Sequence, residues 1–381
     1  MREPIRFNVS SLHEICPEME NLYALLFKKI ERTRNMKLSN LIRISFLIFV
    51  FALIGTSQPV AFATTSLKSY EATKVKAFNE IRKATESGSA KNLKLNYEIS
   101  PSFPADLRKI YVAQARYTSK LVATFLPENE VINIYLYTEK DASKIAKHEV
   151  LSRDSESFQR WFDEWKQGIG REHNLGLAAW YTQSSAGWQG HAGLIAYSGA
   201  NSKSLRRYAI QVLPHEYFHV VQDYYLNKDR GFSWPSYDAY AIYSPPTFRE
   251  GSANTISFAL ASKNTKEYLS LYRYFIGEKK NQKEVKFFDE LSTPAQVITA
   301  LKIMENNNNR QDVHEASYAI GQILYEWVIA EYGFDGYRRI IQNQIKVDSF
   351  AENIQLSLGI SVEELYSKAA PHLVAAFKYG Y

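Results

Sequence analysis

The spacing of apolar residues along the chain changes near Ser204, and this change limits the folds that the chain can adopt. Before it, the segments "NLKLNYEI" (92–99) and "VINIYLYT" (131–138) alternate apolar and polar residues as β-strands do. After it, helical periodicity continues to the C-terminus. The sequence therefore predicts an α+β fold, with a mixed α/β lobe over residues 64–204 and a mostly helical lobe over residues 205–381.

The predicted first lobe contains helices and a third strand as well. A polar helical pattern runs from about Leu67 to Glu86, and an apolar-periodic helix lies between the two strands from about Pro104 to Phe125. The glycine-spaced segment "GHAGLIAYSG" (190–199) again has the pattern of a strand.

Residues 36–63 have the pattern of a secretory signal peptide. Positive side chains follow Met36, an apolar run covers residues 44–54, and a small-x-small cleavage site ends at Ala63. The apolar run is short for a membrane span, although a retained anchor is the alternative. We expect a secreted or periplasmic protein that is cleaved after Ala63 and is not stably inserted in a membrane. Residues 1–35 are then an upstream extension.

Charge and cysteine content exclude two classes of function. Residues 64–381 carry 38 Lys and Arg against 35 Asp and Glu, an excess that is too small and too scattered to predict a nucleic-acid partner. The one cysteine, Cys16, lies upstream of the predicted cleavage site. The mature chain would therefore have no thiol for catalysis and would need no disulfide.

The segment "VLPHEYFHVVQDYY" (212–225) carries the pattern His-Glu-x-x-His. Residues four apart lie on one face of an α-helix, so His215 and His219 can offer their imidazoles to a single ion, with Glu216 beside it. Pro214 suits the first turn of such a helix. Burying these polar groups without partners would cost roughly several kcal/mol, and a zinc ion would be a suitable partner.

A second helix is predicted to supply a third ligand, because a catalytic zinc ion usually takes three protein ligands and leaves one position open. In "PPTFREGSANTISFAL" (245–260), a helix begins after two prolines and carries Glu250 and Asn254 on one face. Thr247 and Glu250 also form a capping-box pattern, in which the glutamate turns back to the start of its helix and needs no metal. The residues alone leave both alternatives open.

These motifs resemble those of the gluzincin zinc metallopeptidases, the superfamily of thermolysin and the zinc aminopeptidases. The resemblance implies a zincin-like fold and a Zn²⁺ site formed by His215, His219 and Glu250. It further implies that Asn254 orients a ligand histidine through a hydrogen bond. Asp223 matches an aspartate of the family pattern and would, like Asn254, support the ligands from outside the ligand set, with a solvated helix residue as the alternative.

The resemblance covers roughly residues 190–360 and implies two further parts of an active site. The segment "HEASYAIGQILYEWVIAEYG" (314–333) looks like the family helix that brings a tyrosine to the reaction centre, here Tyr318, with His314 in reserve and a plain packing tyrosine as the alternative. The segment "GHAGLIAYS" lies where the family has an edge strand that pairs with extended substrate. His191 in this strand is expected to be structural or exposed rather than a ligand.

The function implied by the resemblance is zinc-dependent hydrolysis of a bond in a peptide or protein substrate. Zinc would activate a water molecule, Glu216 would act as the general base, and Tyr318 would stabilise the oxyanion. The Gly-x-Met-Glu-Asn-like signature of the aminopeptidase branch is missing, which favours an endopeptidase. One alternative is a non-catalytic binding or cell-surface interaction protein on the same scaffold, and another is a helical domain in which the three ligand residues are coincidental.

Overall fold

The computed structural model describes residues 65–152, 163, 175–196, 202–228, 243–281, 291–306 and 311–379. The predicted upstream extension, signal peptide and cleavage site lie outside these residues. From Phe62 to Tyr381 the chain forms one compact unit, and its fold is α+β as predicted. Within the described ranges, no helix is both long enough and apolar enough to cross a membrane.

The strands form one mixed sheet with the order β1-β2-β4-β3. β1 (Lys94–Ile99) and β2 (Val131–Thr138) confirm the first two predicted strands and pair in parallel. Parallel neighbours need a crossover, which here contains the predicted helix α4 (Ala105–Val122). β2 also pairs in parallel with β4 (Gly187–Ala196), and β4 pairs antiparallel with β3 (Leu175–Ser184).

The expectation that the segment 190–199 forms an edge strand is wrong. This segment overlaps β4, which lies inside the sheet between β2 and β3. β3 comes directly before β4, and the chain reverses between them in a tight turn that ends at Gly187, whose φ of +91° favours glycine. β3 therefore lies antiparallel along the outer side of β4. Among the described strands, β3 is therefore the edge on this side. Alternating residues identify a strand but do not identify its neighbours.

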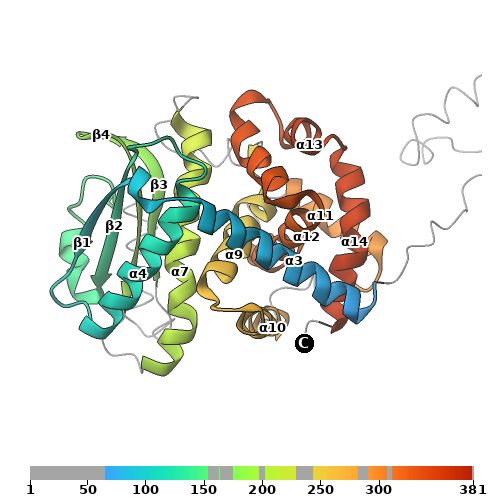
Figure 1. The fold of residues 1–381 in the computed structure, drawn as a ribbon, viewed down its shortest axis with the longest axis horizontal. Helices are drawn as coiled ribbons and strands as arrows, with labels where there is room; N and C mark the ends of the chain where they lie inside the picture. The colour runs from blue at the N-terminus through green and yellow to red at the C-terminus, as the bar shows by residue number, and fades with distance from the viewer. Residues whose placement is uncertain are drawn as a thin grey trace, which may run out of the picture. The chain divides into compact units, whose positions relative to one another are not determined.

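Helix α7 (Ser202–Asp223) lies with α4 over one face of the sheet (Figure 1). α7 packs against β3 and β4. A glycine allows the close approach, because a Cβ on Gly190 would lie 2.4 Å from Val220 Cγ1 of α7. The sheet thus holds α7 in place, and α7 carries the His-Glu-x-x-His motif.

Most of the remaining helices gather around α12 (Gln311–Asn343), which packs against α9 (Pro246–Ala261) and α3 (Leu67–Ser87). α3 confirms the first predicted helix. It packs with the helical part of the fold although it precedes the strands in the sequence, and a lobe boundary near residue 204 stays a prediction. The other described elements are α5 (Ala142–Ile145), a π-helix (Tyr224–Lys228), α10 (Thr265–Asn281), α11 (Pro294–Asn306), α13 (Phe350–Leu358), α14 (Val362–Tyr379) and three short 3-10 helices (Ala90–Asn92, Glu139–Asp141 and Gln344–Lys346).

An aromatic contact ties the sheet-covering helix to the helical part. The ring of Phe125 lies edge-on to Phe218 of α7, with centroids 5.6 Å apart, and edge-on to Phe334 of α12, with centroids 5.7 Å apart. Such pairs stabilise a core by about 0.5–1.5 kcal/mol beyond their buried area. Phe125 thus contacts both α7, which carries the motif, and α12 of the helical part.

Candidate metal centre

The His-Glu-x-x-His motif lies in the second half of α7. The helix begins at Ser202 and contains Pro214 in its interior, so the expectation that Pro214 lies in the first turn is wrong. An interior proline removes one backbone hydrogen bond and costs about 3 kcal/mol. Tight packing offsets this cost, because Leu213, Tyr217 and Val221 on the same helix are fully buried.

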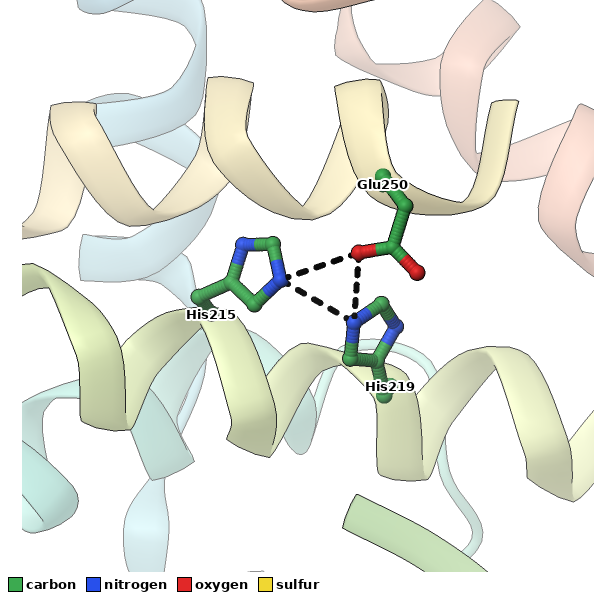
Figure 2. Close-up of side chains that lie close together, drawn as sticks. All are labelled: His215, His219 and Glu250. Atoms are coloured by element: carbon green, nitrogen blue, oxygen red, sulfur yellow. Dashed lines mark hydrogen bonds and ion pairs between the residues drawn. The ribbon is translucent and has the colours of Figure 1, made fainter. Parts of the chain in front are cut away.

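The side chains of His215, His219 and Glu250 converge between α7 and α9 (Figure 2). Glu250 Oε2 lies 3.3 Å from His215 Nε2 and 3.4 Å from His219 Nε2. The two imidazole nitrogens lie 3.1 Å apart. A tetrahedral zinc ion with ligand distances of about 2.0–2.1 Å places its ligand atoms about 3.3 Å from one another. The three atoms therefore have the spacing of three corners of a tetrahedron around one ion.

Glu250 does not cap its own helix. α9 has Pro245 at its N-cap and no hydrogen bond from a capping side chain. Within the described residues, Thr247 Oγ1 is buried without a hydrogen-bond partner. The Glu250 carboxylate is instead directed across to α7 (Figure 2) and is 8% exposed. The capping-box alternative is therefore wrong.

The charges of the cluster shift the pKa values of its members. Burial alone would raise the pKa of Glu250, but the His219 and His215 imidazoles outweigh it and hold this pKa well below its ordinary value. Burial alone would lower the pKa of His219, but the Glu250 carboxylate outweighs it and the pKa is raised. The ionised carboxylate thus favours a positive charge beside it, which a proton on His219 or a divalent cation can supply.

Gln222 belongs to this site, although no motif in the sequence includes it. Its side chain is 2% exposed, and its Oε1 lies 2.6 Å from His219 Nδ1. Gln222 Nε2 donates hydrogen bonds to the Arg249 carbonyl oxygen at 2.9 Å and to Ser252 Oγ at 2.8 Å. The one signal in the sequence is its place three residues after His219, which puts the two on one face of α7.

Neither residue expected to support a ligand histidine makes a hydrogen bond to one. Asn254 Nδ2 donates to the Tyr318 carbonyl oxygen at 3.2 Å, and His215 Nδ1 is buried without a hydrogen-bond partner in the described part of the chain. Both ring nitrogens of His219 face other groups, namely Gln222 and the ligand cluster. Asn254 therefore ties α9 to α12. Asp223 is fully buried, so the alternative of a solvated helix residue is wrong, and its supporting role stays a prediction.

Tyr318 of α12 lies beside the ligand cluster. Its ring is stacked on that of His215, with centroids 5.8 Å apart. Burial raises the pKa of the Tyr318 phenol well above its ordinary value, and the carboxylates of Glu250 and Glu216 raise it further. The hydroxyl therefore stays protonated and can donate a hydrogen bond. The side chain of His314, the reserve candidate, lies outside the described residues.

Two glycines explain how α12 comes so close to α9. A Cβ on Gly251 would lie 2.2 Å from the carbonyl carbon of Gly321, and a Cβ on Gly321 would lie 2.2 Å from the carbonyl oxygen of Thr247. Only glycine fits at this crossing. Because Glu250 precedes Gly251 and Tyr318 lies one turn before Gly321, the crossing brings these two functional candidates together.

Glu216 is half-buried on α7, next to His215 in the sequence. Its carboxylate contributes to the raised pKa of His219, after the larger effects of burial and of Glu250. Glu216 therefore lies close enough to the cluster to act on it electrostatically, while its own side chain is not one of the three converging ligands.

His191 lies on β4 and is remote from this chemistry. Gly190 faces Val220 of α7, so the next residue of the strand faces the opposite side of the sheet. The imidazole is 2% exposed, and its Nδ1 is hydrogen-bonded to Tyr135 Oη at 2.8 Å. The structural interpretation of His191 is therefore the better one.

That face of the sheet bears a polar pocket of about 460 Å³, which includes no residue of the ligand cluster. Its side-chain amides bond to one another across three strands. Asn96 Nδ2 donates to Asn133 Oδ1 at 3.1 Å, and Asn133 Nδ2 donates to Gln189 Oε1 at 2.7 Å. We place the candidate chemistry at the buried cluster, where charges and ligand atoms converge, rather than in this pocket.

Comparison of the chain with protein-family models, with curated proteins and with solved structures finds no match. The candidate site therefore depends on the residues and on their geometry: two imidazoles from α7 and one carboxylate from α9 are directed at a common point.

Proposed function

We propose that the chain is a zinc-dependent peptidase of the gluzincin type, with His215, His219 and Glu250 as the metal ligands. The observation that carries this proposal is the convergence of three ligand atoms at mutual distances of 3.1, 3.3 and 3.4 Å. Two neutral imidazoles and one carboxylate leave the cluster one negative charge, which suits a divalent cation. A set of two nitrogens and one oxygen is typical of catalytic zinc sites that keep a fourth position open.

Zinc, when bound here, supplies a Lewis acid that polarises a carbonyl group and makes a water molecule acidic near neutral pH. The residues of the chain then have separate tasks. Glu216 accepts a proton from the attacking water while the oxygen of that water bonds to the scissile carbonyl carbon. Glu216 then passes the proton to the nitrogen of the leaving group. The Tyr318 hydroxyl donates a hydrogen bond to the carbonyl oxygen as negative charge develops on it.

The arrangement around the cluster supports a zincin-like fold as part of this proposal. The two ligand-bearing helices α7 and α9 pack together, and α7 lies on a mixed sheet whose outer strand β3 is antiparallel to its neighbour. An edge strand can pair with an extended peptide through its backbone groups. We therefore assign the peptide-pairing role to β3 instead of β4, with a peptide or protein as the substrate. Secretion or export to the periplasm is part of the same proposal and rests on the signal-peptide pattern of residues 36–63.

The test of this function is the Glu216→Gln variant. Its amide cannot accept the proton, while the three ligands are unchanged, so we expect full zinc content and loss of hydrolysis of a peptide library. Glu331→Gln on the exposed surface of α12 is the matched control and should keep both properties. Wild-type hydrolysis by Glu216→Gln would remove the proposed base. Zinc binding by the wild type without any hydrolysis would instead favour the non-catalytic binding protein.

A further inference from the structure

We propose that Gln222 is a positioning residue that fixes the tautomer of His219 and connects the two helices that carry the ligands. This inference rests on the proposed metal site, because the expected effect of the Gln222 hydrogen bonds is a higher affinity for a metal ion.

The orientation of the Gln222 amide follows from one of its partners. The Arg249 carbonyl oxygen has lone pairs and no hydrogen, so the amide atom 2.9 Å from it must be the NH₂ group. Ser252 Oγ, 2.8 Å from the same nitrogen, then accepts a second hydrogen bond from it. The carbonyl end, Gln222 Oε1, is therefore the end that faces His219.

The orientation of the amide fixes the proton on the imidazole. Gln222 Oε1 can only accept, so His219 Nδ1, 2.6 Å away, must carry the hydrogen and donate it. In the neutral ring the lone pair is then on Nε2, the atom 3.4 Å from Glu250 Oε2. An imidazole without this bond would divide its population between two tautomers, of which only one offers Nε2 to a metal.

The same amide also fixes the distance between the two helices. Gln222 belongs to α7, and its two acceptors belong to Arg249 and Ser252 of α9, on either side of Glu250. One buried side chain thus holds a ligand histidine and the backbone next to the third ligand. His215 has no such support in the described residues, because its Nδ1 lacks a hydrogen-bond partner. The positioning of the cluster is therefore asymmetric, with His219 as its fixed member.

The experiment measures zinc affinity of the full chain by competition with a chromophoric chelator, for the wild type and three variants. Gln222→Met keeps the length of the side chain and removes all three hydrogen bonds, so we expect zinc binding about 10–100-fold weaker. Gln222→Glu keeps an acceptor at His219 Nδ1 and should bind zinc more tightly than Gln222→Met. Ser252→Ala removes one acceptor of the amide but leaves the Arg249 carbonyl, so its zinc affinity should fall between those of the wild type and Gln222→Met.

A second measurement reads the tautomer directly. Long-range ¹⁵N–¹H spectra of metal-free protein, recorded where His219 is neutral, should show hydrogen on Nδ1 alone in the wild type and a tautomer mixture in Gln222→Met. The His219 signals are assigned by their loss in His219→Ala, and thermal unfolding with chelator present checks that each variant folds. Zinc affinity of folded Gln222→Met equal to that of the wild type, or Gln222→Glu no better than Gln222→Met, overturns the proposal. If the wild type binds no zinc, the proposed function fails. The spectra of metal-free protein still test whether Gln222 fixes the tautomer of His219.

Discussion

The crossing of α9 and α12 gives a prediction whose size follows from the structure. In Gly321→Ala, the new methyl group would lie 2.2 Å from the Thr247 carbonyl oxygen and 2.8 Å from Gly251 Cα. Both atoms belong to backbone, so a rotamer change cannot relieve the clash, and the helices must separate by about 1 Å to restore ordinary contact. Overpacking of this kind costs up to about 3 kcal/mol. The better helix propensity of alanine returns about 1 kcal/mol, which leaves a net loss near 2 kcal/mol.

The assay is urea unfolding of chelator-treated protein, together with zinc competition and peptide hydrolysis. Separation of α9 from α12 moves Tyr318 away from Glu250, whereas the ligands on α7 and α9 keep their places. We therefore expect hydrolysis to fall more than zinc affinity. Gly187→Ala is the control, because its Cβ would meet nothing within 4 Å and its strain is confined to the turn between β3 and β4. Stability of Gly321→Ala at or above that of the wild type would refute the close-crossing argument.

Three further predictions concern charge and catalysis. Tyr318→Phe should lower kcat about 10²–10³-fold with unchanged zinc affinity, measured by steady-state kinetics, since one oxyanion donor is lost; unchanged kcat would contradict the assignment. Lys74→Met should cost about 3–5 kcal/mol in urea unfolding below the Lys74 pKa of about 7, because buried Glu326, 3.8 Å from the charged Lys74 Nζ, loses its cation, and adding Glu326→Gln should restore part of this stability. In metal-free protein, the depressed pKa of Glu250 contributes its full stabilisation of the fold above pH 4.5, the ordinary pKa of a glutamate. The raised pKa of His219 contributes its full stabilisation below pH 6.5, the ordinary pKa of a histidine. The advantage of the wild type over Glu250→Gln in metal-free unfolding should therefore be largest between these two values and fall as pH rises above 6.5; an advantage that grows above pH 6.5 would contradict this reasoning.

The burial of Lys74 has a consequence of its own for the dependence of stability on pH. Burial lowers the pKa of this ammonium to about 7, although the Glu326 carboxylate opposes the shift. The unfolded chain then binds more protons than the folded chain between about 7 and the ordinary value of 10.5. This residue therefore contributes a rise in unfolding free energy as pH increases across that window, and Lys74→Met should remove the rise.

Local patterns in the sequence predicted several of the elements and the three residues that converge between α7 and α9. Period-two alternation located β1 and β2, and helical periodicity located α3 and α4, whereas the helix that overlaps α12 is expected from the family resemblance. His215 and His219 share a helix face by spacing alone. Glu250 lies on a second helix, and the sequence predicted it as a third ligand because a zinc site with two histidines lacks one, with a capping box as the alternative. The structure brings its carboxylate to the two imidazoles, and its role as a metal ligand stays a prediction.

The rest depends on contacts between distant residues, which spacing does not encode. The position of β4 inside the sheet follows from the turn at Gly187 and from pairing with β2. Asn254 lies four residues after Glu250, yet it faces the backbone of α12 because the glycine crossing brings that helix so near. Gln222 belongs to no sequence motif, and its proposed positioning role can be inferred only from the structure, in which α9 supplies two acceptors for its amide.

The central claim is that His215, His219 and Glu250 together hold one divalent ion. The most direct test is the zinc content of the purified full chain after equilibration with zinc and removal of the excess, for the wild type and for Glu250→Ala. The account predicts one zinc ion per wild-type chain and a loss of affinity in Glu250→Ala greater than the roughly 10–100-fold typical of an outer-sphere change. A wild type that binds no zinc, or a folded Glu250→Ala that binds zinc as tightly as the wild type, would contradict it.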